Sequence, residues 1–595
     1  MQTSLQIPAQ TQTRTRDRIA APWRRVLVSV VLALLAGIGV CRVVSTYHIL
    51  NQTTDEPASL APGIELIQRG TYVIDPIHPP LARVAVAVGP YLSGLRLKGQ
   101  GNVWEQGTEI FLENNQYLHE LSLARMGVLP FFLIAIVLVW YWTRARYGEA
   151  PALLAVLLFT TIPVVLGHAG QATTDIAVTA TLIGALLAGI YFLERASYVR
   201  AAVLGTAAGL AILSKFSSLV FLPACGVALL GWRFLLQRKK KKMDAPSGGR
   251  FLWGRGLSLA ILALCLTIWA GYRFSFEPLM VGPARARPAL DHLVGKQGSL
   301  HDLAYKVSGA VSIPAPGFFH GLAATREHAA NGHKSYLFGQ VREKGWWYFF
   351  PVALSVKTPI ALLLLIVFAS FYLVRRSWVE NDWMVAAPVI AAAALLLVCI
   401  PSTINIGVRH LLPIYPLLAI IGGVGAWQLW HIAKPKFLGP TIVVLLLGWQ
   451  LAASFQAHPD YFAYFNEFAG QHPERILIDS DLDWGQDVIR LSSALQERHI
   501  EQVSIAYAGS ADLGHFGLPP YRMLVPHQPT TGWIAISLLR LKTGGVNLPT
   551  DSFAWLEAYQ PVCVVGRSIR LYHISEAAGA EPERPASTSL EKNHP

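Results

Sequence analysis

Long apolar runs separated by short polar loops dominate the first three quarters of this 595-residue chain. A helix that crosses a bilayer needs about 20 consecutive apolar residues. Eleven runs come close to that length or reach it: 26–46, 126–143, 151–170, 174–194, 200–215, 217–236, 255–274, 351–373, 384–401, 410–430 and 438–455. The pattern predicts an all-α polytopic membrane protein with about 11 transmembrane helices over residues 26–455.

The pattern changes after residue 455. Short apolar segments, each the length of a strand, occur at 503–507, 533–537 and 562–565, and residues 485–498 have the spacing of an amphipathic helix. Residues 456–575 are therefore predicted to form a small α/β domain. The tail 576–595 is rich in Ala, Glu, Pro and Ser, a composition typical of disorder.

Basic residues predict the orientation of the chain in the membrane. Lys or Arg occurs in six regions beside the apolar runs, at 1–25, 144–150, 195–200, 237–254, 374–383 and 431–437. Such loops are retained in the cytoplasm. If all six regions are cytoplasmic, successive spans cross the membrane in alternating directions. The tail 1–25 is then cytoplasmic, loops 47–125 and 275–350 are external, and the C-terminal domain is extracytoplasmic. We expect a multi-pass protein of the plasma (inner) membrane.

Composition agrees with a membrane protein. The chain is 53% hydrophobic and only 14% charged, with a mean hydropathy of +0.40. The net charge of +13 fits basic loops that set orientation better than it fits a nucleic-acid partner. Four of the five cysteines lie in apolar runs, so we predict no disulfide framework and no zinc site.

Acidic residues mark two positions on the external side. Asp55 and Glu56 follow the first span, and Asp175 stands at the mouth between the third and fourth spans. A carboxylate outside the bilayer can accept a proton, and an ionisable group entering an apolar helix indicates function. The alternative for Asp55 and for Asp175 is a helix N-cap.

Basic residues on the same side could form an anion site, most naturally for a lipid phosphate. The candidates are His78, Arg83, Lys215, Lys357 and Arg409, which is followed by His410. Any one of them could instead be an interface anchor. For Lys215 the alternative is that its side chain snorkels to the membrane surface.

A cluster of aspartates precedes the C-terminal domain. Its members are Asp479, Asp481, Asp483 and Asp487. Carboxylates at this spacing can bind a divalent cation. A loop followed by a helix start is the interpretation that we favour, so no cofactor is assigned and a cation is left open.

Several motifs together resemble a known family. Besides Asp55-Glu56 they are His78–Arg83, Gly209–Lys215, Gly345–Pro351 with Lys357, Arg409–Pro416, Tyr464–Glu467 and Asp483–Asp487. Their order along the spans resembles the GT-C membrane glycosyltransferases of family 39, the dolichyl-phosphate-mannose protein mannosyltransferase-like group, with the bacterial lipid A aminoarabinose transferases as a related branch. The resemblance covers residues 20–490.

The resemblance implies a GT-C fold with an external active site, a sugar donor linked to polyprenyl phosphate, and a protein or envelope-glycolipid acceptor. Asp55 would be the catalytic base beside Glu56, and Asp175 would assist. His78, Arg83, Lys215, Lys357 and Arg409 would bind the donor phosphate. Transfer would be a single inverting displacement. The aminoarabinose branch has Lys at the position of His78, which puts the role of His78 in doubt.

Two other functions stay open. A transporter or flippase of a lipid-linked or anionic substrate would use intramembrane charges as its path, and it would show repeats and broken helices in matching halves. We find neither in the sequence. A non-catalytic scaffold that works through its C-terminal domain would leave the charged residues near the spans unexplained.

Overall fold

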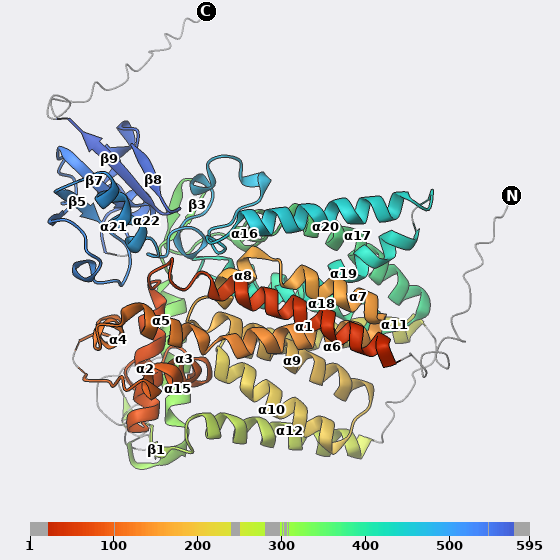
Figure 1. The fold of residues 1–595 in the computed structure, drawn as a ribbon. Helices are drawn as coiled ribbons and strands as arrows, with labels where there is room; N and C mark the ends of the chain where they lie inside the picture. Colours follow the sequence, from red (N-terminus) through yellow and green to blue (C-terminus); the bar gives the residue numbers. More distant parts are fainter. Residues whose placement is uncertain are drawn as a thin grey trace, which may run out of the picture.

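The computed structural model describes residues 22–99, 101–239, 250–279, 298–299, 302, 306, 309–432, 434–545 and 547–575. Within them, a helical body carries a small domain with a β-sheet at one of its ends (Figure 1). The predicted disordered tail 576–595 and nearly all of the predicted cytoplasmic tail 1–25 lie outside the described residues.

Eight helical segments of the described residues are long and apolar enough to cross a membrane, or nine if one bent pair counts as a span. They are α1 (Pro22–Val44), α5 with α6 (Tyr117–Met126, Leu129–Tyr147), α9 (Asp175–Glu194), α11 (Ser218–Lys239), α12 (Arg250–Gly271), α17 (Ile360–Glu380), η4 with α19 (Val408–Ile414, Tyr415–Ile432) and α20 (Leu438–Gln456). The bent pair is α7 (Glu149–Phe159) and α8 (Pro163–Ala169), which meet at 67°.

This number is lower than the eleven spans that the sequence predicts. Two predicted spans, α10 (Tyr198–Ser214) and α18 (Ala387–Cys399), are 17 and 13 residues long. A third, 151–170, is the bent pair α7 and α8, which counts as a span only when the two helices are taken together. The predicted span 351–373 keeps one long apolar helix, α17, but α17 is broken from α16 (Phe349–Lys357). The break falls at Thr358 and Pro359, which have extended backbone, and proline has no N–H to continue a helix. Apolar composition alone did not reveal these interruptions.

One end of the helical body carries most of the polar structure. The loop 47–125 contains α2 (Asp55–Arg69), α3 (Pro80–Leu92) and α4 (Val103–Leu112), and the loop 275–350 contains α15 (Pro316–Asn331). Two short pairs of antiparallel strands, β1 (Phe276–Pro278) with β2 (Ser312–Pro314) and β3 (Ser335–Leu337) with β4 (Gln340–Arg342), accompany them. In Figure 1 these elements and the C-terminal domain lie on the left, whereas the C-terminus of α11 lies on the right. The last turn of α11 contains Arg238 and Lys239.

The C-terminal domain confirms the predicted small α/β unit. Its sheet has the order β6-β5-β7-β9-β8, with β5 parallel to β6 and β7, and with β9 antiparallel to β7 and β8. The strands are β5 (Val503–Ala506), β6 (Tyr521–Met523), β7 (Gly532–Ser537), β8 (Cys563–Val565) and β9 (Ile569–Ile574), and the helices are α21 (Val488–Glu497) and α22 (Leu538–Thr543). The prediction missed β6, which is exposed throughout, and β9.

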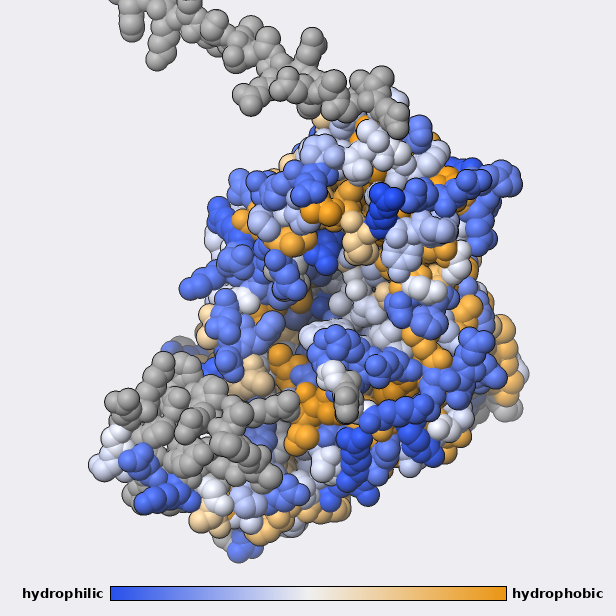
Figure 2. Space-filling view, turned by 90° about the vertical axis from the view of Figure 1, so that its left-hand side faces the viewer, coloured by the Kyte–Doolittle hydropathy of each residue, from blue (hydrophilic) through white to orange (hydrophobic). Residues whose placement is uncertain are grey.

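The segment that enters this domain is bonded to the loop 47–125. Thr54 donates its backbone N–H to the carbonyl of Trp484 at 3.0 Å, and the N–H of Val488 donates to Asn51 Oδ1 at 2.7 Å. Figure 2 views this end of the molecule and shows a hollow with hydrophilic side chains within it. The contacts attach the C-terminal domain beside the residues that immediately precede Asp55.

Candidate functional site

Asp55 is the first residue of α2, and its carboxylate faces a cation from far along the chain. Thr54 before it is fixed by two hydrogen bonds to the carbonyl of Trp484, one from its N–H and one from its hydroxyl. Arg409, at the start of the η4–α19 segment, donates from Nη1 to Asp55 Oδ2 at 2.5 Å. The Asp55 side chain is 31% exposed, so its carboxylate is open to a substrate. The helix does start here, as the N-cap alternative requires, but Thr54 makes no side-chain cap.

Asp175 and Lys215 extend this pair into a row of alternating charges. Lys215 Nζ lies 2.6 Å from Asp175 Oδ1, and Arg409 Nη1 lies 4.0 Å from Asp175 Oδ2. The order is therefore Asp55, Arg409, Asp175, Lys215. Lys215 follows the last residue of α10 with extended backbone and is 7% exposed. Because its ammonium is buried on a carboxylate, the snorkelling alternative does not describe it.

Glu56 points away from this row and holds the surrounding loops together. Its carboxylate forms two short contacts with Arg125, at 2.8 and 2.9 Å, and both side chains are fully buried. It also accepts from the N–H of Thr53 at 2.7 Å and from that of Ala172 at 2.8 Å. These bonds tie the loop before Asp55 to the loop before Asp175. The predicted catalytic role of Glu56 is untested, and its contacts indicate a positioning residue.

Arg83 also has its two terminal nitrogens bonded within the protein, although its buried Nε has no partner among the described residues. Its guanidinium pairs with Asp75 and donates to the Tyr72 hydroxyl and to two backbone carbonyls, and its side chain is 1% exposed. These contacts fix residues 72–78, the turn that carries His78. A direct contact between Arg83 and a phosphate stays a prediction.

The ammonium of Lys357 is also bonded within the protein. Nζ donates to the carbonyls of Phe462 and Asp481 at 2.6 and 2.7 Å, and the side chain is fully buried. It therefore anchors the segment that follows α20 onto the end of α16. A contact with the donor phosphate stays a prediction for Lys357 as well.

Nε of Arg409 and Nε2 of His410, beside the row, are buried nitrogens without a partner among the described residues. The same is true of Nδ1 of His168 and Nε of Arg83. A buried donor without a partner costs about 1–3 kcal/mol, and such groups in a native site mark a place where a ligand can bind. The sequence analysis names His410 only as the neighbour of Arg409 and does not predict that it binds phosphate. Its position next to Arg409 is the feature of the sequence that could have indicated this role.

His78 lies within reach of the same charges. Burial, together with the positive charges of Arg83 and Lys215, holds the pKa of its imidazole well below the usual 6.5. The ring is therefore neutral at pH 7 and can act as a hydrogen-bond donor or acceptor but not as a cation. This environment gives a physical basis for the doubt that its sequence raised.

The His78 environment predicts a pH effect on stability. The folded state excludes a proton that the unfolded chain takes up near pH 6.5, so unfolding binds protons and stability falls as the pH drops below that value. We expect the melting temperature of wild-type protein in detergent to fall more between pH 7.5 and pH 5.5 than that of a His78→Gln variant. Equal losses in the two proteins would contradict the assignment.

The aspartate cluster fulfils mainly structural roles. The Asp481 carboxylate accepts from the N–H of Val408, that of Asp483 accepts from Leu539, and that of Asp487 accepts from Ser568. The described residues include no group of three or more His, Cys, Asp or Glu side chains placed to hold a metal ion. Three of the four aspartates thus organise the loop and the start of α21.

Gly407 allows the loop that contains Ser480 to lie close to the residues before Arg409. Its φ is +154°, and a Cβ there would overlap the hydroxyl of Ser480, which donates to the carbonyl of Ile406. We expect Gly407→Ala to destabilise the protein by about 1–3 kcal/mol and to lower its melting temperature. Gly448→Ala on α20 is the matched control, because its Cβ would meet open space. Equal melting temperatures for the two variants would contradict this account.

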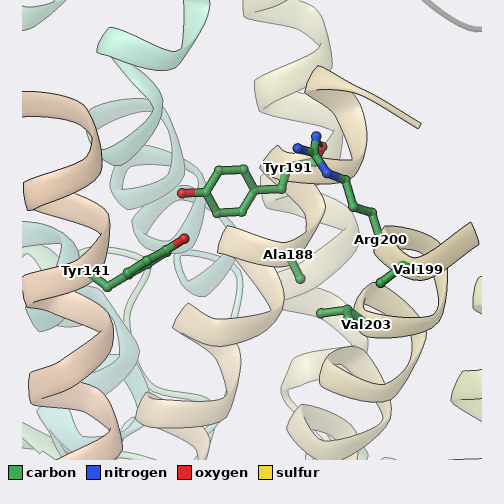
Figure 3. A pocket seen from close by; sticks show the side chains of 6 residues that line it. All are labelled: Tyr141, Ala188, Tyr191, Val199, Arg200 and Val203. Atoms are coloured by element: carbon green, nitrogen blue, oxygen red, sulfur yellow. Dashed lines mark hydrogen bonds between the residues drawn. The ribbon is translucent and has the colours of Figure 1, made fainter. Parts of the chain in front are cut away.

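A separate cavity of about 250 Å³ lies near the loop 195–200, between α6, α9 and α10. Figure 3 shows Tyr141, Tyr191 and Arg200 around it. Arg200 is bonded to the carbonyls of Tyr191 and Arg195. None of the residues that line the cavity belongs to the charged row at Asp55.

The chain also resembles known proteins. Residues 120–247 match the family described as dolichyl-phosphate-mannose-protein mannosyltransferase. This stretch includes Asp175 and Lys215 but neither Asp55 nor Arg409. No curated protein matches the chain in sequence at a significant level.

Solved structures resemble the chain over most of its length at 12% sequence identity. ArnT from Cupriavidus metallidurans is similar in its apo state, with a TM-score of 0.47 over 93% of this chain and 99% of ArnT, and bound to undecaprenyl phosphate, with a TM-score of 0.44 over 92% and 99%. The archaeal oligosaccharyltransferase AglB from Archaeoglobus fulgidus, in complex with an inhibitory peptide and a dolichol-phosphate, has a TM-score of 0.49 over 91% of this chain and 73% of AglB.

Proposed function

We propose that this membrane protein is a glycosyltransferase that moves a sugar from a polyprenyl-phosphate donor to a hydroxyl acceptor at the outer membrane face. The observation that carries the proposal is the row Asp55, Arg409, Asp175, Lys215, in which only Asp55 is substantially exposed. The family match over 120–247 supports the same class of reaction. The N-terminus would be cytoplasmic and the C-terminal domain external.

In the proposed reaction Asp55 acts as the general base. Its carboxylate accepts the proton of the acceptor hydroxyl while that oxygen attacks the anomeric carbon of the sugar. The new bond between carbon and oxygen forms as the bond to the lipid phosphate breaks, and the phosphate leaves with the electron pair. Attack opposite the leaving group inverts the anomeric centre. Because a phosphate is a good leaving group, no general acid is required.

The leaving phosphate gains negative charge, which cations in a site shielded from water stabilise strongly. Lys215 supplies an ammonium, and Arg409 and His410 supply buried nitrogens that have no partner among the described residues. Neutral His78 can add a hydrogen bond. The four groups come from three parts of the chain, so the proposed phosphate site combines residues that no single motif contains.

The arrangement also bears on the transporter alternative. A carrier needs charged groups along a path through the bilayer. Here Asp55, Asp175 and Lys215 stand at ends of α2, α9 and α10, and Arg409 lies near the start of the η4–α19 segment. Thr54, beside Asp55, is bonded to Trp484 of the segment that enters the C-terminal domain. Charges gathered in this way favour chemistry at one face of the membrane.

The test is a transfer assay with purified full-length protein in detergent. Polyprenyl phosphate carrying a radiolabelled sugar is mixed with alkyl glycosides and with peptides that contain Ser and Thr. We expect labelled acceptor and free polyprenyl phosphate to appear in equal amounts. Movement of the intact lipid-linked sugar across vesicle membranes, with no transfer to any acceptor, would contradict the proposal and favour the flippase.

A further inference from the structure

We infer that Asp479, together with Asp55, forms an acceptor subsite that selects uncharged or cationic hydroxyl compounds against anionic ones. The inference rests on the proposed function and names the class of acceptor that the site would take. It assigns a substrate-contacting role to the segment that connects the membrane helices to the C-terminal domain.

Asp479 is placed beside Arg409 by bonds on both sides. It opens the short 3-10 turn η7 (Asp479–Asp481). In that turn Ser480 Oγ donates to the carbonyl of Ile406 at 2.6 Å, and the Asp481 carboxylate accepts from the N–H of Val408 at 3.1 Å. These two bonds align η7 with residues 406–408, immediately before Arg409. Lys357 fixes the far end of the turn through the carbonyl of Asp481.

The electrostatics place the Asp479 carboxylate in the same environment as Asp55. The pKa of Asp479 is raised to about 6, mainly by burial and to a smaller extent by the negative charge of Asp55, against the lowering effects of His333 and Arg409. The Arg409 guanidinium pairs with Asp55 and lies 4.0 Å from Asp175, and its Nε has no partner among the described residues.

The Asp479 carboxylate does not make the structural hydrogen bonds that the carboxylates of Asp481, Asp483 and Asp487 make. Within the described part of the chain, its carboxylate accepts one hydrogen bond, from the N–H of the next residue, Ser480. Its side chain is partly exposed, whereas Asp481, Asp483 and Asp487 are buried. A partly exposed acceptor-only group beside the catalytic carboxylate is suited to hold a hydroxyl or an ammonium of a substrate.

Lys215 pairs with Asp175 and suits a phosphate, whereas Asp55 and Asp479 are both partly exposed carboxylates on which the charge of Arg409 acts. Two unit charges 4 Å apart interact by about 1 kcal/mol in water and by about 4 kcal/mol near a protein surface. An acceptor with a phosphate near Asp479 would therefore be disfavoured by about tenfold or more, because 1.4 kcal/mol corresponds to a factor of ten.

Asp479→Asn is the suitable variant. Asp479 has a φ of +41°, a left-handed conformation that asparagine adopts more readily than most residues. The substitution therefore removes the charge while the turn is kept. Asp512→Asn is the matched control, since Asp512 is a half-exposed aspartate of the C-terminal domain whose described contacts are with Gly514 and His515.

The experiment compares two acceptors in the transfer assay, an uncharged alkyl glycoside and the same glycoside bearing a phosphate ester. Wild-type protein should prefer the uncharged acceptor by about tenfold in kcat/KM. Asp479→Asn should raise the KM for the uncharged acceptor, reduce the preference by about fivefold or more, and leave the KM for the donor unchanged. The Asp512→Asn control should match wild type.

The outcomes separate this inference from the function on which it rests. Transfer to both acceptors with an unchanged preference in Asp479→Asn would overturn the inference alone. A change confined to the KM for the donor would also overturn it and place Asp479 on the phosphate side. Absence of transfer to any hydroxyl, water included, by the wild-type protein would contradict the proposed function itself.

Discussion

Replacing Asp55 with asparagine is expected to lower the rate of sugar transfer by about 10²–10⁴-fold, the contribution typical of a general base. The amide has nearly the shape of the carboxylate but cannot take the proton of the acceptor hydroxyl. The rate is measured as labelled acceptor formed per mole of folded protein at saturating donor. Near-normal transfer by Asp55→Asn would remove Asp55 from the chemistry.

The design allows loss of chemistry to be separated from loss of structure. The Asp55 side chain is 31% exposed, and Arg409 remains 4.0 Å from Asp175 when the Asp55 charge is gone. We therefore expect the melting temperature to change little. Asp512→Asn again serves as the control, because it removes a more exposed carboxylate whose described contacts are with Gly514 and His515.

Glu56→Gln is expected to have the largest effect on stability. The change leaves the fully buried Arg125 without its counter-charge, and breaking one partner of such a pair costs about 3–5 kcal/mol. The melting temperature in detergent should fall by many degrees. Glu113→Gln is the control, since its partner Lys98 is 71% exposed and pairs of this kind contribute about 1 kcal/mol or less.

The same variant tests how Glu56 contributes to activity. A positioning residue that ties the loop before Asp55 to the loop before Asp175 should lower stability and activity together when it is lost. A residue that contacts the substrate should lower activity at an unchanged melting temperature. The second result would restore Glu56 to the catalytic role that its place beside Asp55 first indicated.

Several features of the fold could be predicted because they depend on local sequence. Spans such as 174–194 and 438–455 follow from the length of an apolar run, and the structure has α9 and α20 there. The strands at 503–507 and 533–537 follow from a short apolar pattern. The broken span at Thr358-Pro359 was missed, because proline ends a helix without making its surroundings less hydrophobic.

The residues of the candidate site were also predictable one at a time. Asp55, Asp175, Lys215 and Arg409 each attract attention as a charge beside or within an apolar run. The uses of Arg83 and Lys357 were not predictable in this way. A basic residue that binds a phosphate and a basic residue that binds backbone carbonyls cannot be told apart in a sequence.

The sequence by itself determined that this chain enters a membrane, where many of its apolar helices lie, and that a small α/β domain follows them, because hydrophobic length and periodicity are properties of neighbouring residues. Only the tertiary structure decided which charges meet. Asp55 and Arg409 are 354 positions apart, and Lys215 finds Asp175 across 40 positions. Such pairs are selected by the packing of helices around them, since burying either charge without the other would be too costly.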